Sequence, residues 1–555
     1  MYKQVLDPVG GSLFASTLFA ALPIATLFVL LGIVKMRAHV ASLVALVVAI
    51  LVAVIVYSMP AGQALDSALE GAVFGLFPIM WIVWNAIWIY NMTDATGHFA
   101  VLRRSFSQIS DDQRIQAVII AFSFGALLEA LAGFGTPVAI TSVMLVGLGF
   151  RPIKAASVAL VANTAPVAFG AIAIPIVTLA GLTDLPKEDL GAMVGRQTPL
   201  LAVFVPIILV GMVDGARGIK ATWPAAMVGG VTFAVAQFAC SNYVSVELTD
   251  IVASLLSVGC MVAFLRVWQP RDRVPAEAGG VRPAVAGAAT ADPVHEQEVR
   301  RRDGTATGDS GRDILAAYLP YLIIIVVFAL AQIGPIKDFL DKPTQEFDWP
   351  GLNIVGASGD APSSVTYKLN WLGAAGTLLL ISGVLTMLAL RVSPGRALRI
   401  YGKSLNQLKW ATLTVAAVLA LAYVMNLSGQ TITIGTWIAG AGGVLGLLSP
   451  IIGWLGTAVT GSDTSSNSLF GVLQVKAAKD AGLNPTLLAA ANSSGGVLGK
   501  MVSPQNLAIG AAAVGLGGQE GELFRRVLKW SLLLLAIMCV LVYLQTTAVL
   551  SWMVV

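Results

Sequence analysis

The sequence predicts an all-α polytopic membrane protein with about twelve transmembrane helices, further interrupted or re-entrant segments, and two inverted-topology repeats. Three observations support this fold class. The 555 residues are 57% hydrophobic and only 12% charged, so there are too few charged side chains to cover a soluble protein of this length. Apolar runs close to the length of a membrane-spanning helix recur along the whole chain. Motifs of the N-terminal half return in the C-terminal half at a constant separation.

The apolar runs define the candidate spans in order. The hydrocarbon core of a bilayer is about 30 Å thick and requires roughly 20 apolar residues in a helix. Some of the runs are too short or too broken by glycine to cross as simple helices, which is why we expect interrupted segments. The first run lacks a basic leader and is too long for a signal-peptide core, so we expect a retained span. The runs are 12–34, 39–58, 71–91, 115–134, 136–150, 155–180, 197–214, 222–241, 250–267, 313–333, 370–390, 409–426, 447–461, 464–475, 485–517 and 526–552.

The basic residues give the expected orientation. Lys35 and Arg37 begin a series of basic pairs in alternate loops, whereas the loops at 59–70 and 242–250 contain neither Lys nor Arg. The positive-inside rule then places the N-terminus outside the cytoplasm. The Ala-, Gly- and Pro-rich stretch of mixed charge before the second half should be a flexible cytoplasmic linker. The expected organisation is a first inverted repeat at 1–214, connecting transmembrane helices at 215–268, the linker at 269–312, and a second inverted repeat at 313–555.

An internal repeat is the most informative feature. The segment VANTAPVAFGAIAIP contains Asn163, and AANSSGGVLGKMVSP contains Asn492, with a glycine and a proline following each at matching distances. At a similar separation, FGALLEALAGFGTP (124–137) corresponds to WLGTAVTGSDTSSN (454–467). The loop charges give the first spans of the two halves opposite directions. This pattern is typical of inverted-repeat transporters, whose binding site lies between the repeats.

The segment TGSDTSSN at 460–467 is strongly polar but lies between apolar stretches. Backbone at membrane depth must be surrounded by protein or by a water-filled cavity. A helix broken here would present amide groups and a positive dipole end to a substrate carboxylate. The alternative is an exposed loop with a Ser or Asp N-cap. The predicted substrate-binding residues of this break are Ser462, Thr464, Ser465, Ser466 and Asn467, and those of the matching break in the other half are Gly133 and Gly135.

Asp463 and Glu129 are the candidate proton carriers. Asp463 lies within the polar break, and Glu129 lies in an apolar run just before the glycine break. An ionised carboxylate inside the membrane is costly, so its charge state should depend on its neighbours. The alternative for each is a capping or structural hydrogen-bond role.

A bound carboxylate also needs a compensating positive charge. Arg196 and Lys500 are the cations nearest the predicted breaks, and either could pair with the substrate or with an acidic residue. Snorkelling to the interface is the alternative for both. The predicted substrate-binding set also includes Asn163, Thr164, Asn492 and Ser493, although the asparagines could instead cap broken helices, and His39, for which an interfacial role is the alternative.

These residues lie in motifs that resemble those of the L-lactate permease family of bacterial lactate/glycolate:proton symporters. The resemblance extends from LDPVG near the N-terminus to SWMVV at the end. It is carried by FGALLEALAGFGTPVAIT, VANTAPVAFGAIAIPI, MVGRQTP, DGARGIKATWPA, GWLGTAVTGSDTSSNSLFG and SSGGVLGKMVSPQNLAI. It implies a carrier in the bacterial cytoplasmic membrane that imports L-lactate, glycolate or D-lactate together with protons. His39 stands where relatives are expected to carry tyrosine.

Other classes of protein fit less well. An enzyme would need a nucleophile–base set or metal ligands, and the sequence contains no HExxH, no GxSxG and no histidine cluster. A channel would also place polar residues at the midplane, but inverted repeats with broken helices favour alternating access. A sodium-coupled organic-anion carrier remains the alternative, because Asp463 with nearby hydroxyls could bind Na⁺. We expect no cofactor, metal or nucleic-acid partner; the expected partners are the carboxylate substrate, protons and the lipid bilayer.

Overall fold

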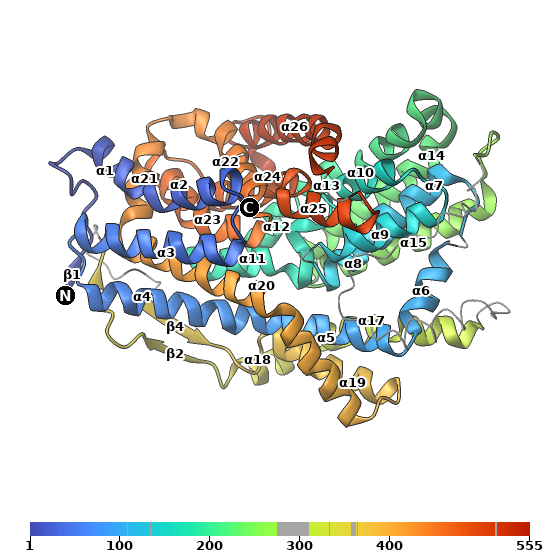
Figure 1. Cartoon of the computed structure of the whole chain (residues 1–555), viewed down its shortest axis with the longest axis horizontal. Coiled ribbons are helices and arrows are strands. Elements are labelled where there is room, and N and C mark those ends of the chain that lie inside the picture. Colours follow the sequence, from blue (N-terminus) through green and yellow to red (C-terminus); the bar gives the residue numbers. More distant parts are fainter. Residues whose placement is uncertain are drawn as a thin grey trace.

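The computed structural model describes residues 1–107, 109–133, 135–274, 310–331, 333–356, 362, 365–516 and 519–555. The chain is mostly helical and elongated (Figure 1). The first half contains α1 (Leu13–Ala20), α2 (Leu22–Phe28), η1 (Val29–Ile33), α3 (Ala38–Ile55), α4 (Ala61–Phe74), η2 (Gly75–Met80), α5 (Trp81–Ala95), α6 (His98–Ser107), α7 (Gln113–Gln116), η3 (Ala117–Phe124), α8 (Gly125–Leu131), α9 (Thr136–Gly147), α10 (Pro152–Ala162), η4 (Val167–Phe169), α11 (Gly170–Thr183), α12 (Lys187–Val194), α13 (Thr198–Ala202), α14 (Val205–Tyr243) and α15 (Thr249–Val267).

The second half begins with α17 (Gly311–Ala331) and α18 (Gly334–Asp341). The remaining helices are α19 (Ala375–Ala389), α20 (Pro394–Ser428), α21 (Gln430–Ala439), η6 (Gly442–Val444), α22 (Leu445–Thr460), α23 (Asp463–Asp480), α24 (Pro485–Gly499), η7 (Lys500–Val502), α25 (Pro504–Ala513), α26 (Glu520–Gln545) and η8 (Ser551–Met553).

Ten helical segments of the described part of the chain are long and apolar enough to cross a membrane, or eleven if the bent pair Pro152–Ala162 and Val167–Thr183 is one span. The expected number was about twelve. The runs 197–214 and 222–241 both fall within one candidate, Lys187–Tyr243. The backbone between these two runs is non-helical at Asp214 and Gly215, so the candidate contains a kink where the sequence separates two spans.

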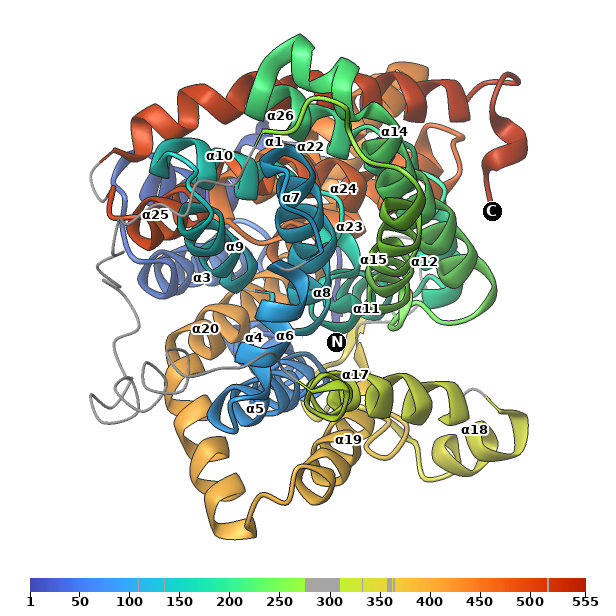
Figure 2. The same cartoon turned by 90° about the vertical axis from the view of Figure 1, so that its right-hand side faces the viewer.

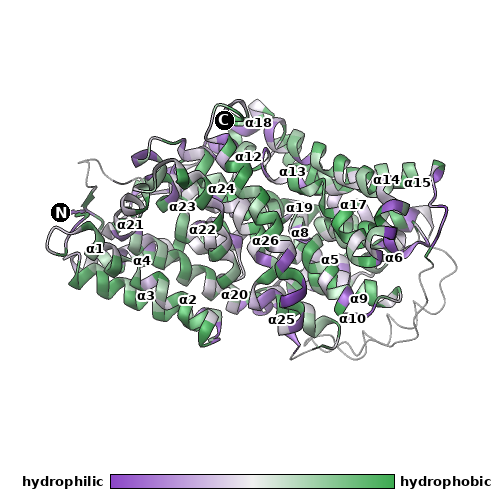
Figure 3. Ribbon diagram, turned by 90° about the horizontal axis from the view of Figure 1, so that it is seen from above, coloured by the Kyte–Doolittle hydropathy of each residue, from purple (hydrophilic) through white to green (hydrophobic). Residues whose placement is uncertain are grey.

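Helix α3 shows how these helices meet lipid. Its exposed face carries large apolar residues such as Val47, Leu51 and Ile55, whereas Ala45 and Ala49 are fully buried. Small residues allow helices in a membrane to approach closely, and large ones can face the lipid tails. Figure 3 shows the same excess of apolar residues over most of the helices.

The helices form two groups, with the earliest segments of the chain packed against late ones. Helix α20 packs against α3, α4 and α5, and α19 packs against α5 and α17. Figure 2 shows α4, α5, α17, α19 and α20 together in its lower part, and α7 to α15 with α22 to α26 above them. Within the upper group, α11 packs against α23 and α8, so the two polar breaks are brought together.

Two small two-stranded sheets accompany the helices. Strand β1 (Tyr2–Lys3) pairs in parallel with β3 (Ile354–Val355), and β2 (Gln345–Asp348) pairs antiparallel with β4 (Thr366–Leu369). An extended segment outside a helix must find partners for its backbone groups, and pairing with a second extended segment supplies them. Of the linker predicted at 269–312, residues 275–309 lie outside the described residues.

The N-terminal peptide also completes the end of a long helix. The side-chain amide of Gln4 donates to the carbonyl oxygens of Asn426 and Leu427, each at 2.9 Å, and the Tyr2 hydroxyl donates to that of Ser428 at 2.8 Å. The last carbonyl groups of a helix have no partner within the helix. The peptide therefore satisfies the C-terminus of α20 inside the protein.

Candidate binding cavity

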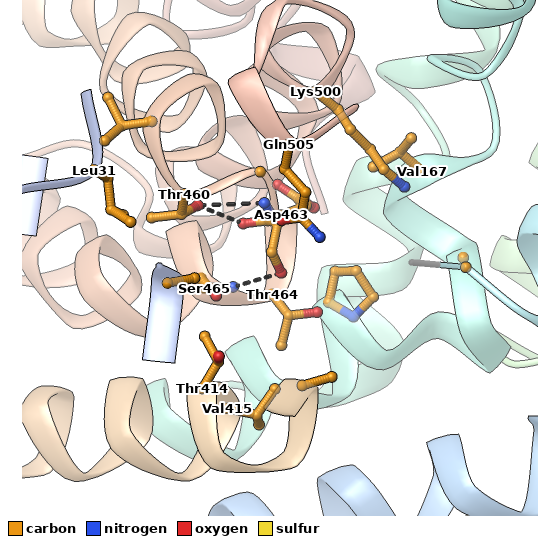
Figure 4. Close-up of a pocket in the computed structure, with 18 of the residues that line it drawn as sticks. Leu31, Val167, Thr414, Val415, Thr460, Asp463, Thr464, Ser465, Lys500 and Gln505 are labelled. Atoms are coloured by element: carbon orange, nitrogen blue, oxygen red, sulfur yellow. Dashed lines mark hydrogen bonds between the residues drawn. The ribbon is translucent and has the colours of Figure 1, made fainter. Parts of the chain in front are cut away.

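A cavity of about 490 Å³ lies between the two groups of helices. Its walls come from the α2–α3 connection, α8, α11, α20, α23 and the segment after α24. Most of its lining is apolar, but it contains two ammonium groups, on the buried Lys500 and the exposed Lys35, and two carboxyl groups, on Asp463 and Glu129. Figure 4 shows Asp463 and Lys500 in the same space, with Lys500 extending toward Val167 from the other half of the chain.

The break between α22 and α23 forms one wall of this cavity, as the sequence predicts. Gly461 ends α22 in the left-handed conformation, with φ of 78°, which glycine adopts without a steric penalty. Ser462 is extended, and its Oγ accepts a hydrogen bond from the Ser465 amide at 3.3 Å, which makes it the N-cap of α23. Ser462, Thr464 and Ser465 all line the cavity, so this N-cap lies at a cavity wall. The positive end of α23 is therefore directed at the cavity.

Lys500 and Glu129 form a buried ion pair across the two halves of the chain. Lys500 Nζ lies 2.5 Å from Glu129 Oε1, and Glu129 Oε2 accepts a hydrogen bond from Asn163 Nδ2 at 3.0 Å. The residues are 8% and 2% exposed. A buried ammonium and carboxylate stabilise each other's charged forms, and breaking such a pair costs about 3–5 kcal/mol.

Asp463 is the second carboxyl group of the cavity. Its Oδ2 accepts a hydrogen bond from Ser493 Oγ at 2.6 Å, and its Oδ1 accepts a weaker one from Thr457 Oγ1 at 3.4 Å. It lies within electrostatic range of Lys500. Lys35 is exposed, and the single buried ammonium group of Lys500 cannot neutralise two buried carboxylates. Since a buried excess charge is costly, the group of three is balanced when one carboxyl group carries a proton.

The backbone at Gly170 and the left-handed turn that follows it lie close to Glu129. Ala171, Ile172 and Ala173 have φ values of 46°, 60° and 57°, a conformation that is strained for residues with a side chain, above all for β-branched isoleucine. The preceding residue, Gly170, is so close to Glu129 that an added Cβ atom would lie 2.8 Å from Oε1. Strained backbone of this kind clusters at functional sites. The sequence gives no sign of the turn, because no glycine stands at the three strained positions.

The other predicted residues divide into two sets. Gly133 and His39 line the cavity, with His39 stacked on Trp410 at a ring separation of 4.5 Å. The set behind the cavity wall consists of Ser466, Asn467, Asn492, Ser493, Asn163, Thr164 and Gly135, none of which lines the cavity. Asn467 receives a hydrogen bond from the Asn492 amide at 2.9 Å and donates to the Pro175 carbonyl at 3.1 Å. Asn467 therefore connects α23, which follows one break, to α11, which packs against the helix α8 that precedes the other.

The asparagines that match in the sequence differ in the structure. Asn163 is the C-cap of α10. Helix capping was the expected alternative to substrate binding for this residue. Asn492 lies inside the continuous helix α24 and caps nothing. The helix persists because no proline follows Asn492 until Pro504, whereas Pro166 closely follows Asn163.

Arg196 does not lie at the cavity, which corrects its predicted role in binding. Its Nε donates to Asn242 Oδ1 at 2.9 Å and its guanidinium to the Met553 carbonyl at 3.0 Å. The short helix α12 and the turn after it direct this side chain toward the C-terminal segment. Conversely, Thr414, Trp410 and Gln505 line the cavity but are not among the residues predicted from the sequence. The two from α20 lie at the start of an ordinary apolar run, and no local signal distinguishes them.

Membrane-spanning helices around a buried, charged cavity define a multi-pass membrane transport protein. A family model for L-lactate permease matches residues 16–549. The chain is 42% identical to the L-lactate permease of Bacillus subtilis over 100% of both chains, and 40% identical to the glycolate permease GlcA of Escherichia coli over 98% of both. Among solved structures it is similar to MtrF of Neisseria gonorrhoeae, with 14% identity, a TM-score of 0.46, and coverage of 87% of this chain and 84% of that one.

The chain belongs to the L-lactate permease family. It is therefore a transporter and not an enzyme.

Proposed function

We propose that this protein is a secondary active transporter that imports L-lactate, and related 2-hydroxymonocarboxylates such as glycolate and D-lactate, by proton symport across the bacterial cytoplasmic membrane. Relatives named L-lactate permease and glycolate permease, each aligned over nearly the whole chain, support the substrate class. The observation that carries the proposal is the Lys500–Glu129 ion pair beside Asp463 inside one cavity.

Lys500 is the proposed partner of the substrate carboxylate. It is the buried cation of the cavity, whereas Lys35 is exposed at the α2–α3 connection. The first turn of α23 adds amide groups and the hydroxyls of Thr464 and Ser465. A planar carboxylate and a neighbouring 2-hydroxyl group need this combination of a positive charge with hydrogen-bond donors and acceptors.

Proton coupling follows from competition for Lys500. While Glu129 is ionised, it occupies the ammonium group that the substrate needs. A proton that neutralises Glu129 releases Lys500 for the substrate carboxylate. With Asp463 also neutral, the buried part of the loaded cavity holds one ammonium group and one carboxylate and is balanced. This arrangement gives one proton per lactate.

Two inverted repeats, at 1–214 and 313–555, are the proposed architecture behind alternating access, joined by the segments 215–268 and 269–312. Matching glycines adopt the left-handed conformation in both halves, with φ of 80° at Gly97 and 93° at Gly429. Each half also has a left-handed glycine at its polar break. The N-terminus lies outside the cytoplasm in this proposal, as the loop charges indicate.

Purified protein in liposomes tests the function. Uptake of labelled L-lactate is measured with a pH gradient alone and, separately, with a sodium gradient alone. Proton symport predicts accumulation with the pH gradient and none with sodium. Accumulation driven only by sodium would instead establish the sodium-coupled alternative, and facilitated exchange with neither gradient would exclude both forms of symport.

A further inference from the structure

A buried carboxyl group outside the cavity, on Asp250, lies close to the charged centre. Asp250 is in the first turn of α15 and is 1% exposed. Its Oδ1 accepts a hydrogen bond from Gln237 Nε2 at 2.8 Å, whereas its Oδ2 has no hydrogen-bond partner among the described residues. Burying a carboxyl group without full hydrogen bonding is costly, so an intramembrane acid of this kind indicates a functional role.

Gln237 connects Asp250 to the Glu129 side of the cavity. The same Nε2 atom also lies 3.3 Å from the carbonyl oxygen of Ala165, two residues after the Asn163 that donates to Glu129. Helix α15 packs against α8, which carries Glu129, and the two carboxyl groups are within electrostatic range of each other. Asn163 Oδ1, like Asp250 Oδ2, is a buried acceptor without a partner in the described structure. Such acceptors can support a water-mediated path.

In the other direction, polar groups continue from Asp250 to the surface. The Cys240 thiol is within electrostatic range of both Asp250 and Glu247. Ser245 Oγ donates to Glu247 Oε2 at 2.9 Å, and Glu247 Oε1 lies 2.5 Å from Nζ of Lys187, whose side chain is 31% exposed. Burial raises the pKa of Glu247, but Lys187 and the Ser245 hydroxyl outweigh this effect and hold the pKa below its usual value. Glu247 is thus an ionised group. It stands near the surface, at the outer end of the series of polar groups that begins at Asp250.

This outer end lies away from the mouth of the cavity. Lys35, Trp410 and Gln505 line the cavity and are exposed, and Trp410 stacks on His39 of α3, so the mouth lies near the start of α3. Lys187 begins α12. Figures 2 and 3 both place α12 and α3 on opposite sides of the molecule. The acids Glu247, Asp250 and Glu129 therefore follow one another from the side opposite the mouth to the charged centre.

We propose that Asp250 is a proton-relay residue that passes the coupled proton between the Glu247 end of this series and Glu129. This role rests on the proposed proton symport. In the transfer, the neutral Asp250 carboxyl group gives its proton to the Glu129 carboxylate. Asp250 becomes the carboxylate, Glu129 becomes the neutral acid, and Lys500 is released for substrate. Asp250 then takes up a proton from the surface end through Glu247.

The test compares Asp250→Asn with Asp250→Glu in liposomes. Asp184→Asn is the matched control, because Asp184 is an exposed acid in a left-handed conformation that asparagine also tolerates. Two rates are measured for each protein: L-lactate uptake driven by a pH gradient, and lactate counterflow at equal pH on both sides. For Asp250→Asn we expect the ratio of driven uptake to counterflow to fall roughly tenfold or more, with a flatter dependence of uptake on pH. Asp250→Glu and Asp184→Asn should keep the wild-type ratio.

Three results would overturn the relay. One is a wild-type ratio and pH profile in Asp250→Asn. Another is a parallel loss of uptake and counterflow in folded Asp250→Asn, since this would assign the residue a structural role. The third is absence of pH-driven uptake in the wild-type protein itself, which would refute proton symport and is recognised without any variant.

Discussion

Lys500 has two acidic neighbours in the cavity. Its ammonium group is almost fully buried and contacts Glu129 at 2.5 Å, while Asp463 acts on it from α23. In a site of low dielectric constant, each of these charges changes the energy of the others by far more than it would in water. In the proposed symport, substrate binding and protonation are therefore coupled through this one cation.

Replacing Lys500 by glutamine should weaken lactate binding strongly. A hydrogen bond to a charged group contributes about 1.5–3 kcal/mol, so we expect the apparent KM to rise roughly tenfold or more. Arg196→Gln is the matched control, because this guanidinium binds Asn242 and the Met553 carbonyl away from the cavity. Uptake kinetics of both variants, normalised to protein in the membrane, measure the effect. A normal KM for Lys500→Gln would mean that backbone amides and hydroxyls alone hold the carboxylate.

Neutralising Glu129 should impair coupling more than exchange. Glu129→Gln removes the ionised competitor for Lys500, so we expect pH-driven accumulation to fall by roughly tenfold or more relative to lactate counterflow. Asp463→Asn replaces a carboxyl group that the proposed mechanism keeps neutral, so this variant should lose less of its coupling. If only one variant shows this loss, that residue carries the coupled proton. Unchanged accumulation in both would rule out both acids as proton carriers.

At the scale of an element, the left-handed turn after Gly170 holds the site in place. Ala171 lines the cavity, and Ile172 and Ala173 are fully buried. Each left-handed residue with a side chain costs roughly 1–2 kcal/mol, so the surrounding packing must enforce the turn. Gly170 allows the Glu129 side chain to approach this backbone closely.

Gly170→Ala should therefore damage the charged centre. The added Cβ atom would lie 2.8 Å from Glu129 Oε1 and must displace the carboxylate that contacts Lys500. We expect lactate uptake to fall roughly tenfold, since a small misplacement of a catalytic or binding group can have effects of this size or larger. Gly147→Ala at the end of α9, where no atom of the described residues lies within 4 Å of the new Cβ, should retain uptake. Equal lactate uptake by the two variants would show that the close approach of Glu129 to Gly170 is not needed for transport.

At the scale of the whole molecule, the cavity lies at the boundary between two groups of helices. Residues of α20, in the lower group of Figure 2, form one wall, and α8, α11 and α23, in the upper group, form the others. Transport requires the cavity to open to each side in turn, and such transitions commonly move one group of helices against the other. The contact between α20 and α23 is therefore expected to change during transport.

A covalent connection across this boundary should stop transport. Thr414 on α20 and Thr464 on α23 both line the cavity and are drawn in Figure 4. They are replaced by cysteine in a background from which Cys240, Cys260 and Cys539 have been removed. After treatment with a cleavable bifunctional thiol reagent, we expect uptake to fall roughly tenfold or more and to return on reduction. Each single cysteine variant controls for modification alone. Normal uptake by protein shown by mass to be cross-linked would indicate that these helices move together.

The sequence by itself determined the features that depend on local chemistry. Hydropathy located the membrane helices, because apolar side chains at membrane depth identify a span wherever the chain is placed. Gly461 and Ser462 marked the α22–α23 break, because a left-handed glycine and an N-cap serine act on their own neighbouring backbone. Asp463 and Glu129 were found because an acid in an apolar run is costly in any fold.

Only the tertiary structure decided which of these residues meet. Lys500 and Glu129 are 371 positions apart. The sequence favours Lys500 over Arg196 only because Lys500 follows a glycine-rich stretch equivalent to the one after Asn163, and this pattern does not show that Lys500 meets Glu129. Asp250 reads as part of a loop in the sequence, although it is buried beside Gln237. The matching of Asn163 with Asn492 did not show that one ends a helix and the other lies inside one. The physical reason is the same in each case: ion pairing and burial depend on distances between helices, and these are set by how the side chains of the whole molecule pack.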